Sequence, residues 1–286
     1  MKKIFAALLC AMTLVNVQAQ DFLKTMKLPE LPTDPAFETR EYHVKSMGND
    51  IFGYAFVPKN VKGKMPLVIM SHGYNGDPVL YYELCDRLAK DGYIAYIFDF
   101  CGGSVRTRST GKTTDMSLRT EQQNLTDIIH DLKAWDNVDP NRIFLVGESQ
   151  GGIVSALTAA ALRDEIKAIA LMYPAFSIPI GAQKNYKSVN DVPETLDIMG
   201  LKLSRKYYAD ILNMNVYQEI SKFDKEVIII HGDHDTLVPL TYSEQALPSY
   251  KHVMLRVIPD APHGFYQPEW MHINAELVHN FFNTQK

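Results

Sequence analysis

Gly147-Glu148-Ser149-Gln150-Gly151-Gly152 is the stretch of this sequence that decides the fold. It follows an apolar run over 142–146 and opens an Ala-rich run over 153–162, which predicts a strand, a tight turn and a helix. The glycines at 147 and 151 let strand and helix approach closely, so the Ser149 hydroxyl would stand exposed above the sheet. In this setting the Gly-x-Ser-x-Gly pattern indicates a nucleophilic serine.

Two later loops offer the partners that such a serine needs. The stretch 227–231 is typical of a short buried strand, and the loop after it contains Asp235. A second strand is predicted over 252–258, and His263 lies on the loop that follows. Loops at the carboxyl ends of parallel strands share one edge of the sheet, so we expect Asp235 and His263 to join Ser149 as acid and base.

The same residues allow other interpretations. Ser149 could cap a helix, although a cap needs no paired glycines. His231, Asp233, His234 and Asp235 could suggest a metal cluster, but their spacing matches no standard zinc pattern, so we expect no metal. We expect Asp233 to fix the turn through an Asx-type hydrogen bond, which leaves Asp235 as the acid.

An anion-binding turn is predicted close to the serine. A buried strand over 65–70 leads into Ser71-His72-Gly73-Tyr74-Asn75-Gly76. We expect the backbone N–H groups of Tyr74 and Gln150 to form an oxyanion hole. Two preorganised donors of this kind commonly contribute a few kcal/mol each to transition-state stabilisation.

These motifs resemble those of the α/β-hydrolase superfamily and, within it, the bacterial cinnamoyl and feruloyl esterase-like group with an inserted cap. The resemblance covers about 45 to the C-terminus and rests on His72-Gly73, 147–152, Asp235 and His263. The order nucleophile, acid, histidine is the order of that superfamily. The group usually has His before the nucleophile and an Asn-Gly-His-Gly-like turn after the fourth strand, where this chain has Glu148 and Cys101-Gly102-Gly103-Ser104.

Composition agrees with an enzyme built around one sizeable core. The chain has 286 residues, of which 46% are hydrophobic and 22% are charged, and its net charge is −4. Lys and Arg are scattered, so a nucleic-acid partner is not expected. Two cysteines, Cys85 and Cys101, follow the N-terminal segment, and they could be bridged or remain buried thiols.

The N-terminus has the pattern of a secretory signal. Two lysines precede an apolar run over 4–15, and small residues follow up to Ala19. We expect cleavage after Ala19, leaving a hydrolase domain over 20–286. The apolar run is shorter than the roughly 20 residues that span a bilayer, so we expect no stable membrane insertion after removal of the signal. The predicted location is the bacterial periplasm or the exterior.

Strands alternate with helices along most of the chain. Strands are predicted over 41–47 and 51–58 around a turn at 48–50, and a mostly parallel sheet follows. The further elements are strands over 67–71, 93–99, 143–147 and 166–172 and helices over about 79–90, 117–135 and 150–163. The alternation stops over about 175–224, which we interpret as a helical cap inserted over the site. A peripheral insertion without substrate contact is the alternative.

The sequence therefore predicts an exported serine carboxylic-ester hydrolase with the triad Ser149, Asp235 and His263. It would act through an acyl-enzyme, without a cofactor, on small-molecule esters such as cinnamoyl, feruloyl or other small acyl esters. Two alternatives stay open. One is an exopeptidase-like amide hydrolase of the same fold, and the other is a catalytically silent binding protein.

Overall fold

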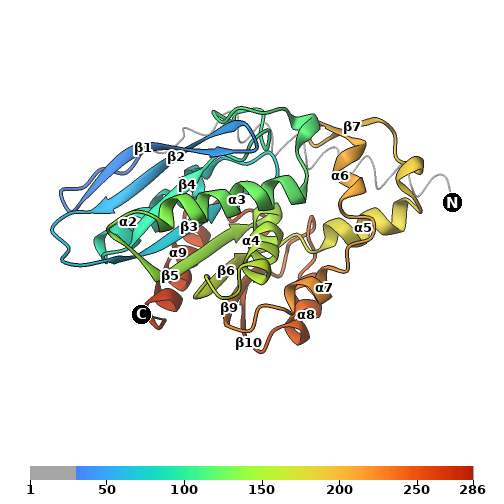
Figure 1. Ribbon diagram of the computed structural model, residues 1–286. Coiled ribbons are helices and arrows are strands. Elements are labelled where there is room, and N and C mark those ends of the chain that lie inside the picture. Colours follow the sequence, from blue (N-terminus) through green and yellow to red (C-terminus); the bar gives the residue numbers. More distant parts are fainter. Residues whose placement is uncertain (1–29, 286) are drawn as a thin grey trace. The chain divides into compact units, whose positions relative to one another are not determined.

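A twisted eight-stranded sheet forms the centre of the computed structural model, which describes residues 30–285 (Figure 1). The strand order is β1-β2-β4-β3-β5-β6-β9-β10. The strands are β1 (Phe37–Ser46), β2 (Asn49–Pro58), β3 (Met65–Ser71), β4 (Ile94–Phe98), β5 (Val138–Glu148), β6 (Ala168–Met172), β9 (Glu226–Gly232) and β10 (His252–Ile258). The predicted signal peptide, residues 1–19, lies outside the described residues.

Parallel pairing dominates this sheet, as the alternating pattern predicts. Strand β2 is antiparallel to both β1 and β4, and the remaining neighbours pair in parallel. The turn between β1 and β2 consists of Met47 and Gly48, both with positive φ (49° and 80°), so it begins one residue before the predicted turn. Paired positive φ values suit the twist of a tight hairpin.

Helices cover both faces of the sheet. On one face α3 (Leu118–Lys133) packs against α4 (Ser149–Ala161), and on the other α2 (Tyr82–Lys90) packs against α9 (Pro268–Asn283) (Figure 1). Shorter elements of the core are α8 (Thr241–Ala246) and the 3-10 turns at Pro78–Tyr81, Thr113–Asp115 and Leu247–Ser249. Strands β3, β4 and β6 are buried along their whole length because both of their faces are covered. Each fully buried Val, Leu or Ile side chain contributes about 1.5–3 kcal/mol.

The predicted insertion over 175–224 is not purely helical. It contains α5 (Ser177–Asn185), a 3-10 turn at Val189–Asp191, α6 (Arg205–Ala209) and α7 (Val216–Ile220). It also contains a hairpin of β7 (Thr195–Ile198) and β8 (Leu201–Ser204), which was not predicted from the sequence. Met199 and Gly200 form its turn with φ values of 42° and 84°, which is the same signal as Met47-Gly48. The expectation of a cap made of short helices was therefore incomplete.

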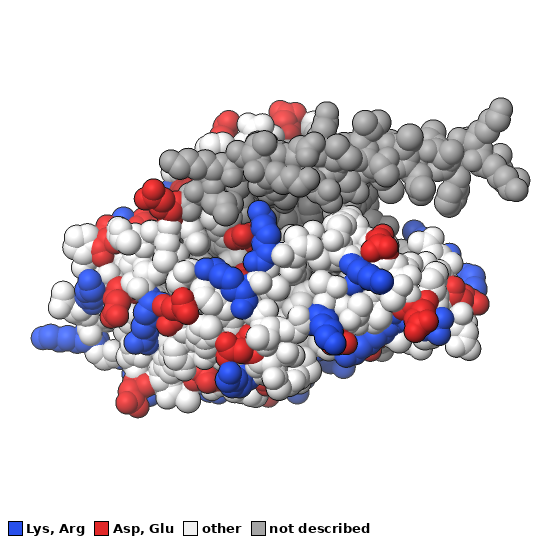
Figure 2. All heavy atoms as spheres, turned by 90° about the horizontal axis from the view of Figure 1, so that it is seen from above, with Lys and Arg blue, Asp and Glu red and all other residues white. Residues whose placement is uncertain are grey.

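Surface charge and helix length bear on possible partners. On the face shown in Figure 2, acidic and basic side chains are interspersed among uncharged residues. Within residues 30–285, no helix combines the length and apolar character needed to cross a bilayer. In the same range, no cluster of three or more His, Cys, Asp or Glu side chains is arranged to hold a metal ion.

Candidate active site

Ser149 lies at the turn where β5 ends and α4 begins. Its φ of 49° is left-handed, a conformation that costs energy for a residue with a side chain. The flanking glycines are required by close approach: a Cβ on Gly147 would lie 2.3 Å from the Gly151 carbonyl oxygen, and one on Gly151 would lie 2.2 Å from that of Ser71. The strained turn is thus held between strand and helix, as the glycine spacing predicts.

The structure brings the three predicted catalytic side chains together. His263 Nε2 lies 3.0 Å from Ser149 Oγ, and His263 Nδ1 lies 2.6 Å from Asp235 Oδ2. An ionised carboxylate can only accept, so Nδ1–H donates to Asp235 and Nε2 is left to accept from the serine hydroxyl. The arrangement can therefore move a proton from Ser149 Oγ to His263.

The environment of Asp235 keeps its carboxyl group ionised. Burial opposes ionisation, but hydrogen bonds from His231, His263 and the Val238 backbone N–H outweigh it and lower the pKa of Asp235 to about 2. The Leu237 N–H also donates to Oδ1 at 3.0 Å. One oxygen is thus held by backbone amides, while the other faces the two histidines.

His231 is a contact of the acid that sequence reasoning missed. Its fully buried Nε2 lies 3.2 Å from Asp235 Oδ2 and 2.8 Å from the Val238 carbonyl oxygen, so Nε2–H faces both acceptors. The Ser243 hydroxyl lies 2.8 Å from Nδ1. The signal available in the sequence was the i,i+4 spacing of His231 and Asp235 across the end of β9.

The role expected for Asp233 was wrong. Asp233 Oδ1 accepts from the Asp260 backbone N–H on the neighbouring loop at 2.8 Å and contacts the side chain of His234. The local Asx-type bonds are made by Asp235, which accepts from residues two and three positions later. Asp233 therefore links the two loops that carry Asp235 and His263.

The predicted oxyanion turn lies directly against the nucleophile. A Cβ on Gly73 would sit 3.7 Å from Ser149 Oγ, so Gly73 lies against the serine, and Tyr74 is the next residue of the turn. Within residues 30–285 the Tyr74 N–H has no hydrogen-bond acceptor. Gln150 is the second residue of α4, where an N–H has no partner within the helix. Both amides are free to bind an anion, and their assignment as an oxyanion hole stays a prediction.

His72 fixes the conformation of this turn. Its Nδ1 lies 2.7 Å from the Gly73 carbonyl oxygen, and its Nε2 accepts from the Phe100 N–H at 3.0 Å. Burial lowers the pKa of His72, which agrees with a neutral ring that donates at one nitrogen and accepts at the other. The segment after β4 thereby supports the turn.

The side chains of Tyr74 and Gln150 reach the insertion. The Tyr74 hydroxyl donates to the Ile198 carbonyl oxygen at 2.8 Å, and Gln150 Oε1 accepts from the Tyr207 hydroxyl at 2.7 Å. Gln150 Nε2 donates to the buried carboxyl group of Glu121 at 2.9 Å. Burial raises the pKa of Glu121 to about 8, despite the opposing effect of this hydrogen bond. These contacts join residues distant in sequence, and no local pattern predicted them.

The two cysteines within residues 30–285 are not bridged. Cys85 and Cys101 are both free and buried, which agrees with the thiol alternative. Burial raises the pKa of the Cys101 thiol to about 12, so it is protonated at neutral pH.

Comparisons with known proteins agree with this architecture. Residues 64–210, just over half of the chain, match the family described as serine aminopeptidase, S33. The structure of Est1E from Butyrivibrio proteoclasticus, with ferulic acid bound, is 29% identical, has a TM-score of 0.77, and the match covers 85% of this chain and 98% of that one.

Curated relatives are more distant. Hydrolase LUC6 from Fusarium sp is 28% identical over 132 residues, which are 43% of this chain and 30% of that protein. The quorum-quenching protein AidA from Acinetobacter baumannii is 22% identical over 181 residues, 63% of this chain and 54% of that protein. The matches thus span about a third to a half of these relatives. The chain belongs to the serine aminopeptidase S33 family of α/β-hydrolases, and the feruloyl esterase-like resemblance drawn from its sequence is confirmed.

Proposed function

We propose that the protein is a serine carboxylic-ester hydrolase that works through an acyl-enzyme. The observation that supports this most is the pair of contacts that links Asp235, His263 and Ser149, at 2.6 Å and 3.0 Å. Nucleophile, base and orienting acid lie in hydrogen-bond reach of one another, which is the geometry that acyl transfer needs.

The mechanism follows from these positions. His263 Nε2 takes the hydroxyl proton as Ser149 Oγ attacks the ester carbonyl carbon, and the resulting oxyanion accepts from the Tyr74 and Gln150 amides. The intermediate collapses, and the leaving alcohol takes the proton from His263. Water then attacks the acyl-enzyme while Nε2 accepts one of its protons. That proton returns to Ser149 Oγ as the carboxylic acid leaves.

We propose hydroxycinnamoyl or other small acyl esters as the substrate class. Est1E, with ferulic acid bound, supports an aromatic acyl group. The insertion over 175–224 serves as a cap, because Tyr207 reaches the side chain of Gln150 beside the proposed oxyanion hole. We further propose that residues 1–19 direct export to the periplasm or the exterior.

An aminopeptidase is the second candidate, favoured by the description of the matching family. Such an enzyme needs an anionic group that binds the substrate's ammonium. Glu121 is the buried acid beside Gln150, and its raised pKa leaves it mostly protonated at neutral pH, which disfavours that role. Comparing feruloyl, acetyl and fatty acyl p-nitrophenyl esters with aminoacyl anilides decides between the two activities.

Replacing the nucleophile tests the proposal. Ser149→Ala should lower ester turnover by a factor on the order of 10⁶, because it removes the attacking atom. It should also abolish labelling by a fluorophosphonate probe, while the thermal unfolding curve stays that of a folded protein. Ester hydrolysis retained by the folded variant would remove the assignment, and a wild-type protein that neither labels nor turns over would favour the silent binding protein.

A further inference from the structure

Glu148 makes two contacts that the mechanism above does not use. It is the last residue of β5, directly before the nucleophile, and only 4% of its surface is exposed. Oε1 accepts from the Gly73 N–H at 3.1 Å, and Oε2 accepts from the Tyr173 hydroxyl at 2.7 Å. One carboxyl group therefore holds two segments that are distant in sequence.

Both segments touch the reacting groups. Gly73 precedes Tyr74 in the turn that lies against Ser149. The ring of Tyr173 packs edge-on against the ring of His263, with their centroids 4.7 Å apart. Tyr173 has a left-handed backbone (φ 36°), so its position depends on tertiary contacts such as the bond from its N–H to the Ile230 carbonyl oxygen at 2.7 Å.

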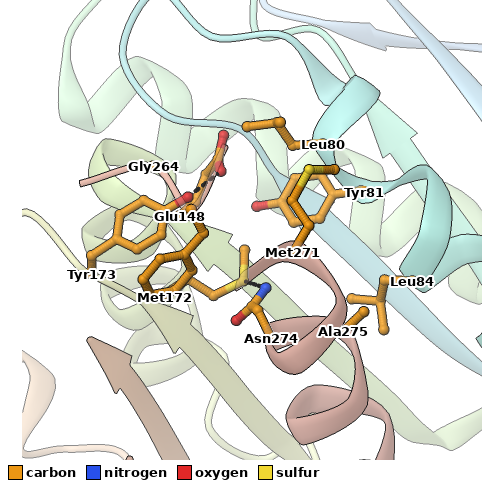
Figure 3. A pocket seen from close by; sticks show the side chains of 11 residues that line it. Leu80, Tyr81, Leu84, Glu148, Met172, Tyr173, Gly264, Met271, Asn274 and Ala275 are labelled. Atoms are coloured by element: carbon orange, nitrogen blue, oxygen red, sulfur yellow. Dashed lines mark hydrogen bonds between the residues drawn. The ribbon is translucent and has the colours of Figure 1, made fainter. Parts of the chain in front are cut away.

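Glu148 and Tyr173 border a small pocket behind the nucleophile. Figure 3 shows their hydrogen bond at one end of this pocket, with Met172, the residue before Tyr173, and with Tyr81 and Asn274 from two other elements around it. Its free volume of about 20 Å³ has room for about one water molecule. Burial raises the pKa of Glu148 to about 7, whereas the bonds from Tyr173 and Gly73 act in the opposite direction. The two contacts therefore help to stabilise a carboxylate that the site would otherwise disfavour.

We propose that Glu148 is a positioning residue for ester hydrolysis, which ties the oxyanion turn and the ring that supports His263 to the strand that carries Ser149. This inference rests on the proposed function. Glu148 does not touch the substrate's reacting atoms; it acts through Gly73 and Tyr173. Losing it should loosen the Tyr74 amide and His263 relative to Ser149 and so weaken transition-state stabilisation more than substrate binding.

The test separates positioning from mere packing by comparing three variants. Glu148→Met keeps the volume but removes both acceptors, and kcat should fall roughly 10- to 100-fold with KM within about threefold. Glu148→Gln can still accept from Gly73 and contact Tyr173, so it should restore most of kcat. Asn274→Ala enlarges the same pocket, and because its side chain bonds to Met172 rather than to Gly73 or Tyr173, kcat should be unchanged.

A double-mutant cycle tests the link to His263. Tyr173→Phe removes only the hydroxyl group that donates a hydrogen bond to Glu148. This substitution should lower kcat in the wild-type background and have little further effect in Glu148→Met. Fully additive effects would overturn the inference, as would a folded Glu148→Met protein with wild-type kcat or a loss confined to KM. If Glu148→Met does not fold, equal kcat values for wild type and Tyr173→Phe would overturn it as well.

The outcome is distinguishable from failure of the proposed function. If the hydrolase assignment fails, wild-type protein shows no turnover or fluorophosphonate labelling that depends on Ser149. If only the role of Glu148 fails, that Ser149-dependent activity remains and the variants at 148 and 173 leave kcat unchanged.

Discussion

The α/β core and the insertion over 175–224 are held in place in different ways. In the core, β3, β4 and β6 are buried along their whole length. The carboxylate of Asp235 contacts two histidines and two backbone amides. In the insertion, β7 alternates between exposed and half-buried residues, and α6 and α7 have five residues each. The site around Ser149 is thus held by one buried hydrogen-bond network, whereas the short elements of the insertion are held by separate contacts with the core, such as those of Asp210 with Ser117 and of Glu219 with Arg119.

The two regions meet at several points, among them Asn75–Met199 and Arg119–Glu219, and two further contacts involve residues of the site around Ser149. Tyr74 and Gln150, whose backbone amides are the predicted oxyanion hole, also bond through their side chains to Ile198 and Tyr207 of the insertion. Substitutions in the core should therefore change kcat, and substitutions that release the insertion should change mainly KM. Substitutions on either side of this junction test that separation.

The largest effect is expected in the core, from Asp235→Asn. Two backbone N–H groups require an oxygen at Oδ1, so the introduced NH₂ must face His263 and His231. It would then donate to His263 Nδ1 and leave the proton on Nε2, which can no longer accept from Ser149. We expect kcat to fall about 10⁴-fold with KM nearly unchanged, measured by steady-state kinetics on the best p-nitrophenyl ester.

Asp233→Asn is the matched control on the same loop. The introduced amide keeps an oxygen for the Asp260 N–H, and Asp233 has no contact with His263. Activity should stay within about threefold of wild type, since a surface polar contact contributes little. A fall in kcat as large as that of Asp235→Asn would instead assign the role of the acid to Asp233.

The core site was predictable because its signals are local. Gly147 and Gly151 are needed where strand and helix come into close contact, and both lie in the same five-residue motif as Ser149. The loops of Asp235 and His263 follow short strands whose parallel pairing puts their carboxyl ends at one edge. The residues that the structure brings together, Ser149, Asp235 and His263, were therefore predictable from the sequence.

The junction with the insertion was not predictable in the same way. Glu121, Gln150 and Tyr207 come from three elements, and their contacts depend on how α3, α4 and α6 pack. The β7–β8 hairpin was missed because its strands have only four residues each, too few for a clear alternation. The Met199-Gly200 pair was the available signal, and the same pair at Met47-Gly48 makes the first hairpin turn.

Glu121→Gln probes the core side of that junction through stability. The raised pKa, about 8 against 4.5 for an ordinary Glu, means that the folded protein holds a proton that the unfolded chain loses above pH 4.5. Wild-type stability should therefore fall as pH rises from 4.5 to 8, by up to about 1.4 kcal/mol per pH unit from this group. Gln cannot ionise. Urea unfolding at pH 5, 6.5 and 8 should therefore show the free energy of unfolding of Glu121→Gln rising relative to that of wild type as pH increases.

The control for this pH series is Glu165→Gln. A hydrogen bond from Lys133 at 2.8 Å lowers the pKa of Glu165, so its stabilising contribution is present above the unfolded pKa and is lost as pH falls. The free energy of unfolding of Glu165→Gln should therefore not rise relative to that of wild type as pH increases. If Glu121→Gln behaves like the control, the Glu121 carboxyl is ionised in the folded protein, and burial at the junction does not keep it protonated.

The smallest effect is expected from Tyr207→Phe, which cuts the insertion's hydrogen bond to Gln150 and leaves Oε1 without its donor. Losing one such bond costs about 1 kcal/mol, so KM should rise roughly fivefold while kcat changes less than threefold. Tyr208→Phe is the matched control, because its hydroxyl makes no hydrogen bond within residues 30–285 while its ring packs on Tyr186 and Tyr207. A fall in kcat at constant KM in Tyr207→Phe, absent from the control, would show that the insertion acts on the transition state. The separation between a catalytic core and a binding insertion would then fail, because Gln150 would pass the effect of the lost bond to its own backbone amide.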